Sequence, residues 1–109
     1  MSSYRYMRLL VMFDLPTNTV NDIRHYANFR KFLLKDGFFM LQYSIYVKIC
    51  TNKDSADLQV KRITKNKPPQ GAIRTLILTE KQYEGMNIII GSKNKYDDKI
   101  GDKKFIIFD

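Results

Sequence analysis

The sequence has almost none of the residues that build disulfides and zinc sites. Cys50 is the only cysteine and His25 the only histidine among 109 residues, which excludes an internal disulfide and any metal site rich in cysteine or histidine. Long apolar runs are also missing. No stretch reaches the length of a membrane-spanning helix, and Met1–Met7 lacks the apolar core of a signal peptide. We therefore expect a soluble, cytoplasmic protein that has no membrane partner.

Acidic residues are few relative to basic ones. The chain has 11 Asp and Glu residues against 19 Lys and Arg residues, which gives a net charge of +8. Such an excess favours a polyanion such as nucleic acid as the partner, although net charge can also serve solubility alone. With 109 residues, 44% of them hydrophobic, the chain is long enough for one folded domain and too short for two.

The stretch Met7–Pro16 contains the strongest strand signal. Five consecutive apolar residues, Leu9–Phe13, indicate a central strand that is covered on both faces. Asp14 follows directly, and Pro16 ends the strand. The carboxyl ends of buried strands are where open α/β sheets tend to place their chemistry, so Asp14 is the candidate catalytic residue. The alternative is that Asp14 only begins the next turn.

Helices and strands are indicated along the rest of the chain by capping residues, helical spacing and aromatic or β-branched runs. Phe38–Cys50 is long for one strand, so we divide it by a tight turn near Gln42-Tyr43-Ser44. The expected elements are a helix over Thr19–Asp36 ended by Gly37, the two strands of Phe38–Cys50, a helix over Asn52–Asn66, a strand over Ala72–Thr79, a helical turn opened by Thr79-Glu80-Lys81-Gln82, and a strand over Met86–Ile90.

Both long helices are expected to carry an apolar stripe with basic residues outside it. The stripes are Ile23, Tyr26, Ala27, Leu33 and Leu34 in the first helix and Ala56, Val60 and Ile63 in the second. The candidate nucleic-acid contacts are Arg24, Arg30, Lys31 and Lys35 in the first helix and Arg62 and Lys65 in the second, although a solvated helix face is often basic too. Arg30 falls inside the first stripe. Because an unpaired buried guanidinium is costly, it needs a partner, a solvent-filled cleft, or a side-chain conformation that reaches the edge of the helix. That partner could be a carboxylate, or a phosphate at a subunit interface.

The end of the chain differs in character from the rest. Residues 92–104 are rich in Lys and Asp and indicate a polar loop. The apolar residues Phe105, Ile106, Ile107 and Phe108 then predict a strand that adds to a sheet edge of its own subunit or of a partner. We therefore divide the chain into a domain over residues 1–91 and a loop with a partner-binding strand over residues 92–109.

The order strand, helix, strand, strand, helix, strand predicts an α+β, ferredoxin-like βαββαβ fold with an antiparallel sheet and further strands at the C-terminus. Both helices then cover one face of the sheet and leave an apolar face bare. A homodimer packed through the sheets is the simplest way to cover it. Such a dimer could bring two copies of Asp14 together to share one Mg²⁺ ion, which a single carboxylate binds weakly.

At this point the chain resembles a known family, the CRISPR-associated protein two family, which is the small subunit of the spacer-acquisition complex. The matching segments are V-M-F-D-L-P in the first strand, F-R-K-F-L-L-K-D-G at the end of the first helix, L-Q-Y-S-I-Y in the hairpin, and T-E-K-Q-Y before the last strand of the domain. The opening Y-R-Y-M-R and the T-E-K-Q segment resemble members from type II-A systems. The match spans nearly the whole chain.

The resemblance implies a homodimer with Mg²⁺-dependent nuclease activity on single-stranded RNA or double-stranded DNA. Asp14 stands at the position of the family's metal ligand, and Arg30 at a basic position of its first helix. Phe13 replaces a tyrosine that the family often has there. The resemblance also implies a dimer that binds DNA and bridges two dimers of the CRISPR integrase. The alternative from the residues alone is a non-catalytic ferredoxin-like RNA-binding or ribosome-associated module, but the aromatic signature of RNA-recognition modules is missing.

Overall fold

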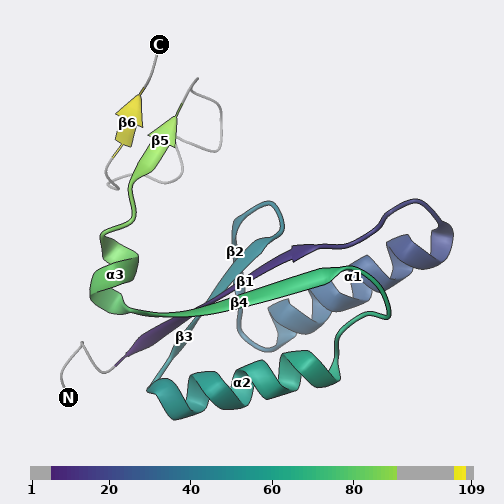
Figure 1. Ribbon diagram of the computed structural model, residues 1–109, viewed down its shortest axis with the longest axis horizontal. Helices are drawn as coiled ribbons and strands as arrows, with labels where there is room; N and C mark the ends of the chain where they lie inside the picture. Colours follow the sequence, from purple (N-terminus) through teal and green to yellow (C-terminus); the bar gives the residue numbers. More distant parts are fainter. Residues whose placement is uncertain (1–5, 91–104, 108–109) are drawn as a thin grey trace.

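The structure, a computed structural model, describes residues 6–90 and 105–107. Its elements follow the expected order along the chain (Figure 1). They are β1 (Met7–Asp14), α1 (Val20–Lys35), β2 (Phe39–Gln42), β3 (Ile45–Cys50), α2 (Lys53–Lys65), β4 (Ala72–Thr79), α3 (Glu80–Glu84), β5 (Ile88–Ile90) and β6 (Phe105–Ile107). Most expected boundaries are confirmed to within a residue or two, and the strand expected over Met86–Ile90 is shorter.

The first four strands form one antiparallel sheet in the order β2-β3-β1-β4. β1 is central: it pairs with β3 from Met7↔Cys50 to Met12↔Ile45, and with β4 from Met7↔Thr79 to Asp14↔Ala72. One helix follows β1 and one follows β3, which is the connectivity of the ferredoxin-like fold. The predicted α+β class and antiparallel sheet are confirmed.

The core lies between one face of this sheet and the two long helices. Successive side chains of a strand point to opposite faces, and Leu9, Val11 and Phe13 of β1 all point to the helices and are buried. Phe29 and Leu33 come from α1, and Ala56 and Ile63 from α2, and all four pack into the same cluster. Both helices therefore cover the same face of the sheet, as predicted.

The apolar stripe of α1 differs from the prediction. Phe29, which we did not assign to the stripe, is the centre of the buried face, while Ile23 and Leu34 are 55% and 42% exposed. The reason is helical geometry. At about 100° per residue, Ile23 and Leu34 lie roughly 120° and 140° around the helix from Phe29. Arg30 lies about 100° from Phe29, at the edge of the buried face, and is exposed.

Within residues 6–90 and 105–107, no helix packs on the other face of the sheet. Leu10 and Val47 lie at its centre and are buried, so the prediction of a strand covered on both faces holds for the middle of β1. Around them, the apolar residues Phe39, Ile49 and Leu76 are each about half exposed. Their register against Leu10 and its neighbours places them on the same face. This open face is therefore apolar and partly exposed.

α3, the element that follows β4, is tied to the start of β1. The guanidinium of Arg8 forms an ion pair with Glu80 and lies 4.3 Å from the ring centroid of Tyr83, so it holds α3 against the sheet. Beyond α3, β5 lies apart from the four-stranded sheet and pairs with β6 in parallel, from Ile88↔Phe105 to Ile90↔Ile107 (Figure 1). The terminal strand thus adds to a strand of its own chain. Phe108 and residues 92–104 lie outside the described residues.

Candidate active site at the end of the first strand

Asp14, the candidate catalytic residue, is the last residue of β1 and is exposed. The alternation along β1 puts it on the open side of the sheet, opposite the helices. It lines a hollow of about 320 Å³ at this end of the sheet. The other residues that line the hollow are Met12, Phe13, Tyr43, Ser44, Ile45, Ala72 and Arg74. They come from the end of β1, the β2–β3 turn and the start of β4.

The β2–β3 turn is held against the end of β1. The backbone N–H of Phe13 donates a hydrogen bond to the carbonyl oxygen of Ser44 at 3.1 Å. Ser44 has a φ of 64°, in the left-handed region that only a minority of non-glycine residues adopt. The hydroxyl groups of Ser44 and Tyr26 are 3.5 Å apart, which links the turn to α1 as well. The turn position we predicted without a glycine marker is therefore confirmed, with Ser44 in the strained position.

Aromatic side chains form the floor beneath Asp14. The Phe13 ring packs edge-on against Phe29 at 5.2 Å between centroids and stacks on Tyr46 at 5.7 Å. It also contacts Tyr26 edge-on at 5.8 Å. Offset and edge-to-face pairs of this kind are favourable beyond the area they bury. They fix the backbone that carries Asp14.

Gly71 permits the close approach of the loop that precedes β4. Its φ is 104°, which favours glycine. A Cβ atom at this position would lie 2.6 Å from Cδ2 of Leu15 and 2.8 Å from the carbonyl oxygen of Asp14. Any side chain there would displace the chain on either side of the candidate site.

The charges in the hollow are one carboxylate and one guanidinium, from Asp14 and Arg74. In the described part of the chain, no group of three or more His, Cys, Asp or Glu side chains is placed to hold a metal ion. One copy therefore offers a single acidic ligand. Tyr43 is the third polar side chain of note here, and the neighbouring Tyr26 raises the pKa of its hydroxyl group.

Two of the six predicted nucleic-acid contacts already have partners within the protein. Arg30 donates from Nε to the hydroxyl of Tyr46 at 2.9 Å, which supplies the partner that its position required. Arg62 forms an ion pair with Asp36, with Nε 2.7 Å from Oδ2, and this guanidinium lowers the pKa of the Asp36 carboxyl group.

The other predicted contacts lie on the helical layer. Arg24, Lys31 and Lys35 are exposed on α1, and Lys65 is exposed on α2. Asp14 points to the opposite side of the sheet. The structure therefore does not bring the basic helix residues together with the candidate catalytic residue.

Arg74 and Tyr43 were missed by the sequence analysis as residues of this site. Arg74 can be assigned only once the register of β4 is known, because the pairing of Ala72 with Asp14 puts Arg74 two residues away on the same face. Tyr43 was placed only in a turn. Nothing local to the sequence indicates that this turn meets the end of β1.

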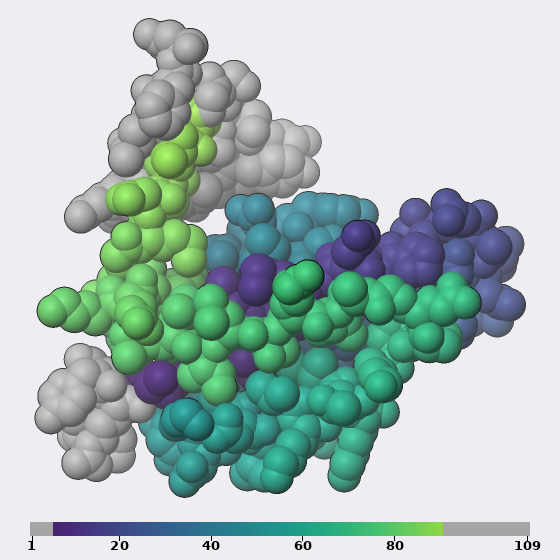
Figure 2. Space-filling model, in the orientation of Figure 1, coloured from purple at the N-terminus to yellow at the C-terminus, as the bar shows by residue number. Residues whose placement is uncertain are grey.

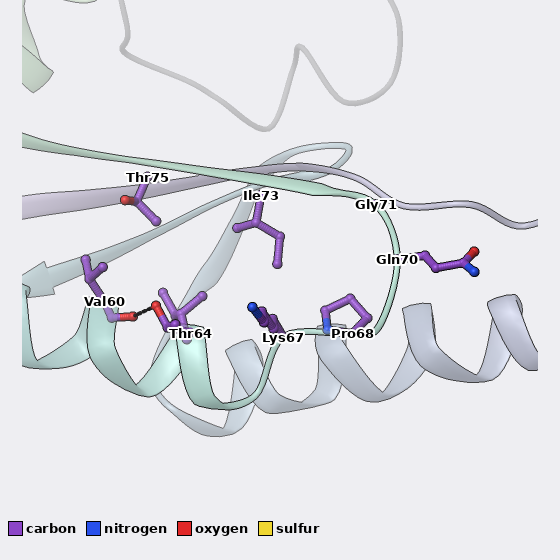
Figure 3. Close-up of a pocket in the computed structure, with 9 residues that line it drawn as sticks. Val60, Thr64, Lys67, Pro68, Gln70, Gly71, Ile73 and Thr75 are labelled. Carbon is purple, nitrogen blue, oxygen red and sulfur yellow. Dashed lines mark hydrogen bonds between the residues drawn. The ribbon is translucent and has the colours of Figure 1, made fainter.

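A second hollow, of about 240 Å³, lies between the end of α2, the loop after it and β4 (Figure 3). Val60, Ile63 and Ile73 contribute apolar groups to it, and Lys67 is its only charged residue. The hydroxyl of Thr64 is already engaged, since it donates to the carbonyl oxygen of Val60 at 2.9 Å. No carboxylate is among its lining residues, so this hollow lacks the acidic metal ligand that the hollow around Asp14 offers.

The fold and the site together define a small ferredoxin-like α+β protein with a single carboxylate at the end of its first strand. Residues 7–86 match the family described as CRISPR associated protein Cas2. The chain belongs to this family.

Relatives named CRISPR-associated endoribonuclease Cas2 are similar over most of their length. The one from Treponema denticola is 50% identical over 91 residues, which cover 83% of this chain and 90% of the relative. The one from Ligilactobacillus salivarius is 48% identical over 89 residues, covering 82% and 88%. The one from Streptococcus mutans is 40% identical over 88 residues, covering 81% of each. Among the described residues, no helix is long and apolar enough to span a membrane.

Proposed function

We propose that the protein is a metal-dependent endoribonuclease whose site is built on Asp14. The observation that carries this proposal is the exposed carboxylate at the end of a buried strand, in a hollow that also contains Arg74. Relatives that cover most of the chain are named as endoribonucleases. A guanidinium that lines the same hollow as the carboxylate suits a phosphate group of the substrate.

The chemistry of the site suits Mg²⁺ as the cofactor. Asp14 provides a hard oxygen ligand that is open to solvent, and Mg²⁺ is often held in proteins by one or two carboxylates together with water and phosphate oxygens. When bound, the ion would supply charge stabilisation at the phosphate and a water of lowered pKa. Asp14 would bind the ion, and Arg74 would orient the phosphate group. Phe13 and the turn at Ser44 would hold this end of β1 in place.

We propose that the working form is a homodimer packed through the open faces of two sheets. Phe39, Ile49 and Leu76 are each about half exposed there, and a contiguous apolar patch on a small domain favours association. A two-fold axis through this face would present Asp14 twice. Sedimentation should give about twice the 12.9 kDa mass of the chain. A stable monomer would contradict this part of the proposal.

The family's role in CRISPR adaptation is the basis of a second part of the proposal. The dimer would bind double-stranded DNA through the basic residues of α1 and α2, Lys31 and Lys65 among them, and bridge integrase dimers. β4, which lies at an edge of the sheet, is open to the surface above α2 (Figure 2), and its free backbone groups could pair with another chain. The tail residues Phe105–Phe108 remain predicted partner contacts. Truncation after Gly101 should leave the four-stranded sheet folded and weaken the dimer or the binding of integrase.

The decisive test is the substitution Asp14→Asn. Cleavage of RNA by the purified dimer should be lost on chelation, restored by Mg²⁺, and lowered about a hundredfold or more by the substitution, as for other groups that stabilise charge in a transition state. Asp57→Asn is the matched control, because this carboxylate lies on α2 and pairs with Lys53 at the surface. Cleavage at the parent rate by Asp14→Asn would overturn the proposal.

A further inference from the structure

Tyr43 is the most exposed large hydrophobic side chain of the β2–β3 hairpin, at 76%. It lines the same hollow as Asp14 and Arg74. An exposed aromatic ring at a hollow that a carboxylate and a guanidinium also line suits a ligand with an apolar, planar part. Neither the predicted phosphate contacts nor the proposed metal ligand uses this ring.

The ring is exposed but held. It stacks on Tyr26 with 6.4 Å between centroids and 25° between planes. The next residue, Ser44, is fixed to β1 by its backbone hydrogen bond to Phe13 and approaches Tyr26 through its hydroxyl. Little conformational freedom of the turn is therefore left to be lost when a ligand stacks on Tyr43.

The hollow combines the three groups that one nucleotide needs. A ring offers a stacking surface for the base, a guanidinium can bind the phosphate, and a carboxylate lines the same hollow. Its volume of about 320 Å³ is within the range of small-ligand sites. A base inside a duplex has both faces covered by its neighbours and cannot stack on a side chain, whereas an unpaired base can.

We propose that Tyr43 is a stacking platform that binds an unpaired base of single-stranded RNA next to Asp14. The role is one of positioning and of selection for single strands. It rests on the proposed endoribonuclease site for its biological meaning, but the binding event itself does not require cleavage. Stacking tolerates every base, so the platform selects strandedness and not sequence.

Binding is measured with the full chain carrying Asp14→Asn, in chelator, so that no cleavage occurs. The probe is a fluorescein-labelled oligouridylate of about twelve nucleotides, which is within the span of single-strand sites, and an RNA duplex of the same length is the comparison. Adding Tyr43→Ala should weaken binding of the single strand about 5- to 150-fold. Tyr43→Phe should bind as the parent does. Duplex binding should be unchanged in both.

Two further variants separate stacking from charge. Arg74→Ala should weaken single strand and duplex alike and lower the dependence of log K on log salt by about one unit, because it removes a phosphate contact. Tyr43→Ala should leave that salt dependence unchanged. Leu58→Ala, which truncates a residue that is 62% exposed on α2, is the matched control and should change neither affinity.

The chain contains no tryptophan, so Tyr43→Trp introduces a single indole reporter at the platform. It should keep the affinity for oligouridylate and be quenched when the strand binds. An indole emission that does not change at saturation would overturn the proposal. So would single-strand affinity unaffected by Tyr43→Ala, an equal loss with Tyr43→Phe, or an equal loss of duplex binding.

The outcome for the stacking platform can be distinguished from the outcome for the proposed nuclease. If Tyr43 governs single-strand binding while the protein with intact Asp14 cleaves no RNA, the nuclease proposal fails and the platform stands. If cleavage depends on Asp14 while the affinity for single-stranded RNA is unaffected by Tyr43→Ala, the platform proposal fails and the nuclease proposal stands.

Discussion

The buried hydroxyl of Tyr46 accepts its hydrogen bond from Nε of Arg30, 2.9 Å away on α1. Tyr46 is only 1% exposed and stacks on Phe13, so its hydroxyl has little access to water. A buried polar group that loses its partner costs more than the hydrogen bond is worth. Arg30 therefore has a structural role next to the candidate site, in addition to the nucleic-acid contact predicted for it.

Arg30→Ala should lower the free energy of unfolding by about 1–3 kcal/mol, because the Tyr46 hydroxyl is left without a partner. In a Tyr46→Phe background the same change should cost much less, and urea unfolding of the four proteins measures the difference. Arg24→Ala is the control, since Arg24 has only a long contact of 3.4 Å with Asn21 at the surface. Equal losses from Arg30→Ala in both backgrounds would contradict this role.

The network around Asp36 should make stability fall in acid. The hydrogen bond from Arg62, followed by that from Gln59, holds the pKa of Asp36 below its ordinary value of 3.8. In the unfolded chain, Asp36 therefore takes up a proton at a higher pH than it does in the folded protein. The contribution of the ionised Asp36 to the free energy of unfolding is complete well above pH 3.8 and is lost as the pH falls through the pKa of the folded state.

Urea unfolding between neutral pH and about pH 2.5 tests the network. Asp36→Asn should lower stability at neutral pH by about 1–3 kcal/mol and flatten the decline in acid. Gln59 donates a hydrogen bond to Asp36 at 2.9 Å and accepts one from Lys48 of β3 at 2.7 Å. The substitution should therefore also weaken the contact between Gln59 and β3. Asp57→Asn should change stability by less than about 0.5 kcal/mol, since its pair is exposed. An acid profile of Asp36→Asn identical to that of the parent would contradict the assignment.

Gly71→Ala should be more harmful than Gly37→Ala, although both glycines have positive φ values of 104° and 97°. At Gly37 the new methyl group would meet only the flexible side chain of Lys48, at 3.5 Å, so the cost is mainly backbone strain. At Gly71 it would collide with Leu15 and with the backbone of Asp14.

Thermal unfolding should therefore show a larger decrease for Gly71→Ala than for Gly37→Ala. RNA binding should decrease only for Gly71→Ala, since this variant displaces the candidate site. Equal effects of the two substitutions on both measurements would show that the close approach at Gly71 has no consequence for Asp14.

Cys50 should resist thiol reagents in the folded protein. It is buried at the end of β3, and burial raises the pKa of its thiol group, which reduces the reactive thiolate. Ellman's reagent at pH 8 should label native protein slowly and unfolded protein at once. Rapid labelling of the native protein, at the rate found in urea, would show that this end of the sheet opens readily.

The exposed lysines of the helical layer should set the salt dependence of duplex DNA binding. Lys31→Ala and Lys65→Ala should each lower the slope of log K against log salt by about one unit, because each phosphate contact releases counterions. Lys53→Ala is the control, since Lys53 is paired with Asp57. An unchanged slope would exclude these two lysines from the path of the DNA.

The sequence was sufficient for the elements and their order because their signals are local. The run Leu9–Phe13 and the capping residues Thr19, Asn52 and Thr79 lie beside the elements they define, and all three caps are present in the structure. The antiparallel sheet follows from the order of the elements. The position of Asp14 at the end of β1 was also predictable, since it depends only on where the apolar run stops.

The surroundings of Asp14 could not be predicted, because they depend on contacts between distant segments. Tyr43 reaches the hollow only because the β2–β3 turn bonds to Phe13, and Arg74 only because β4 pairs in one register with β1. The partners of Arg30 and Arg62 are likewise far away in sequence. The buried face of α1 was predicted incorrectly because Phe29 was left out of the stripe. Ile23 and Leu34 were then assigned to the buried face, although both are exposed.

The central place of β1 also sets the order in which the protein can be assembled during synthesis. β1 has its first partner only when residues up to Cys50 are available, and its second only when β4, ending at Thr79, is complete. Pairings over such sequence separations are slow to form. β1 therefore leaves the ribosome before either of its partner strands, and its apolar run Leu9–Phe13 stays unpaired until they are made, which makes the nascent chain, and not the finished fold, the form most exposed to aggregation.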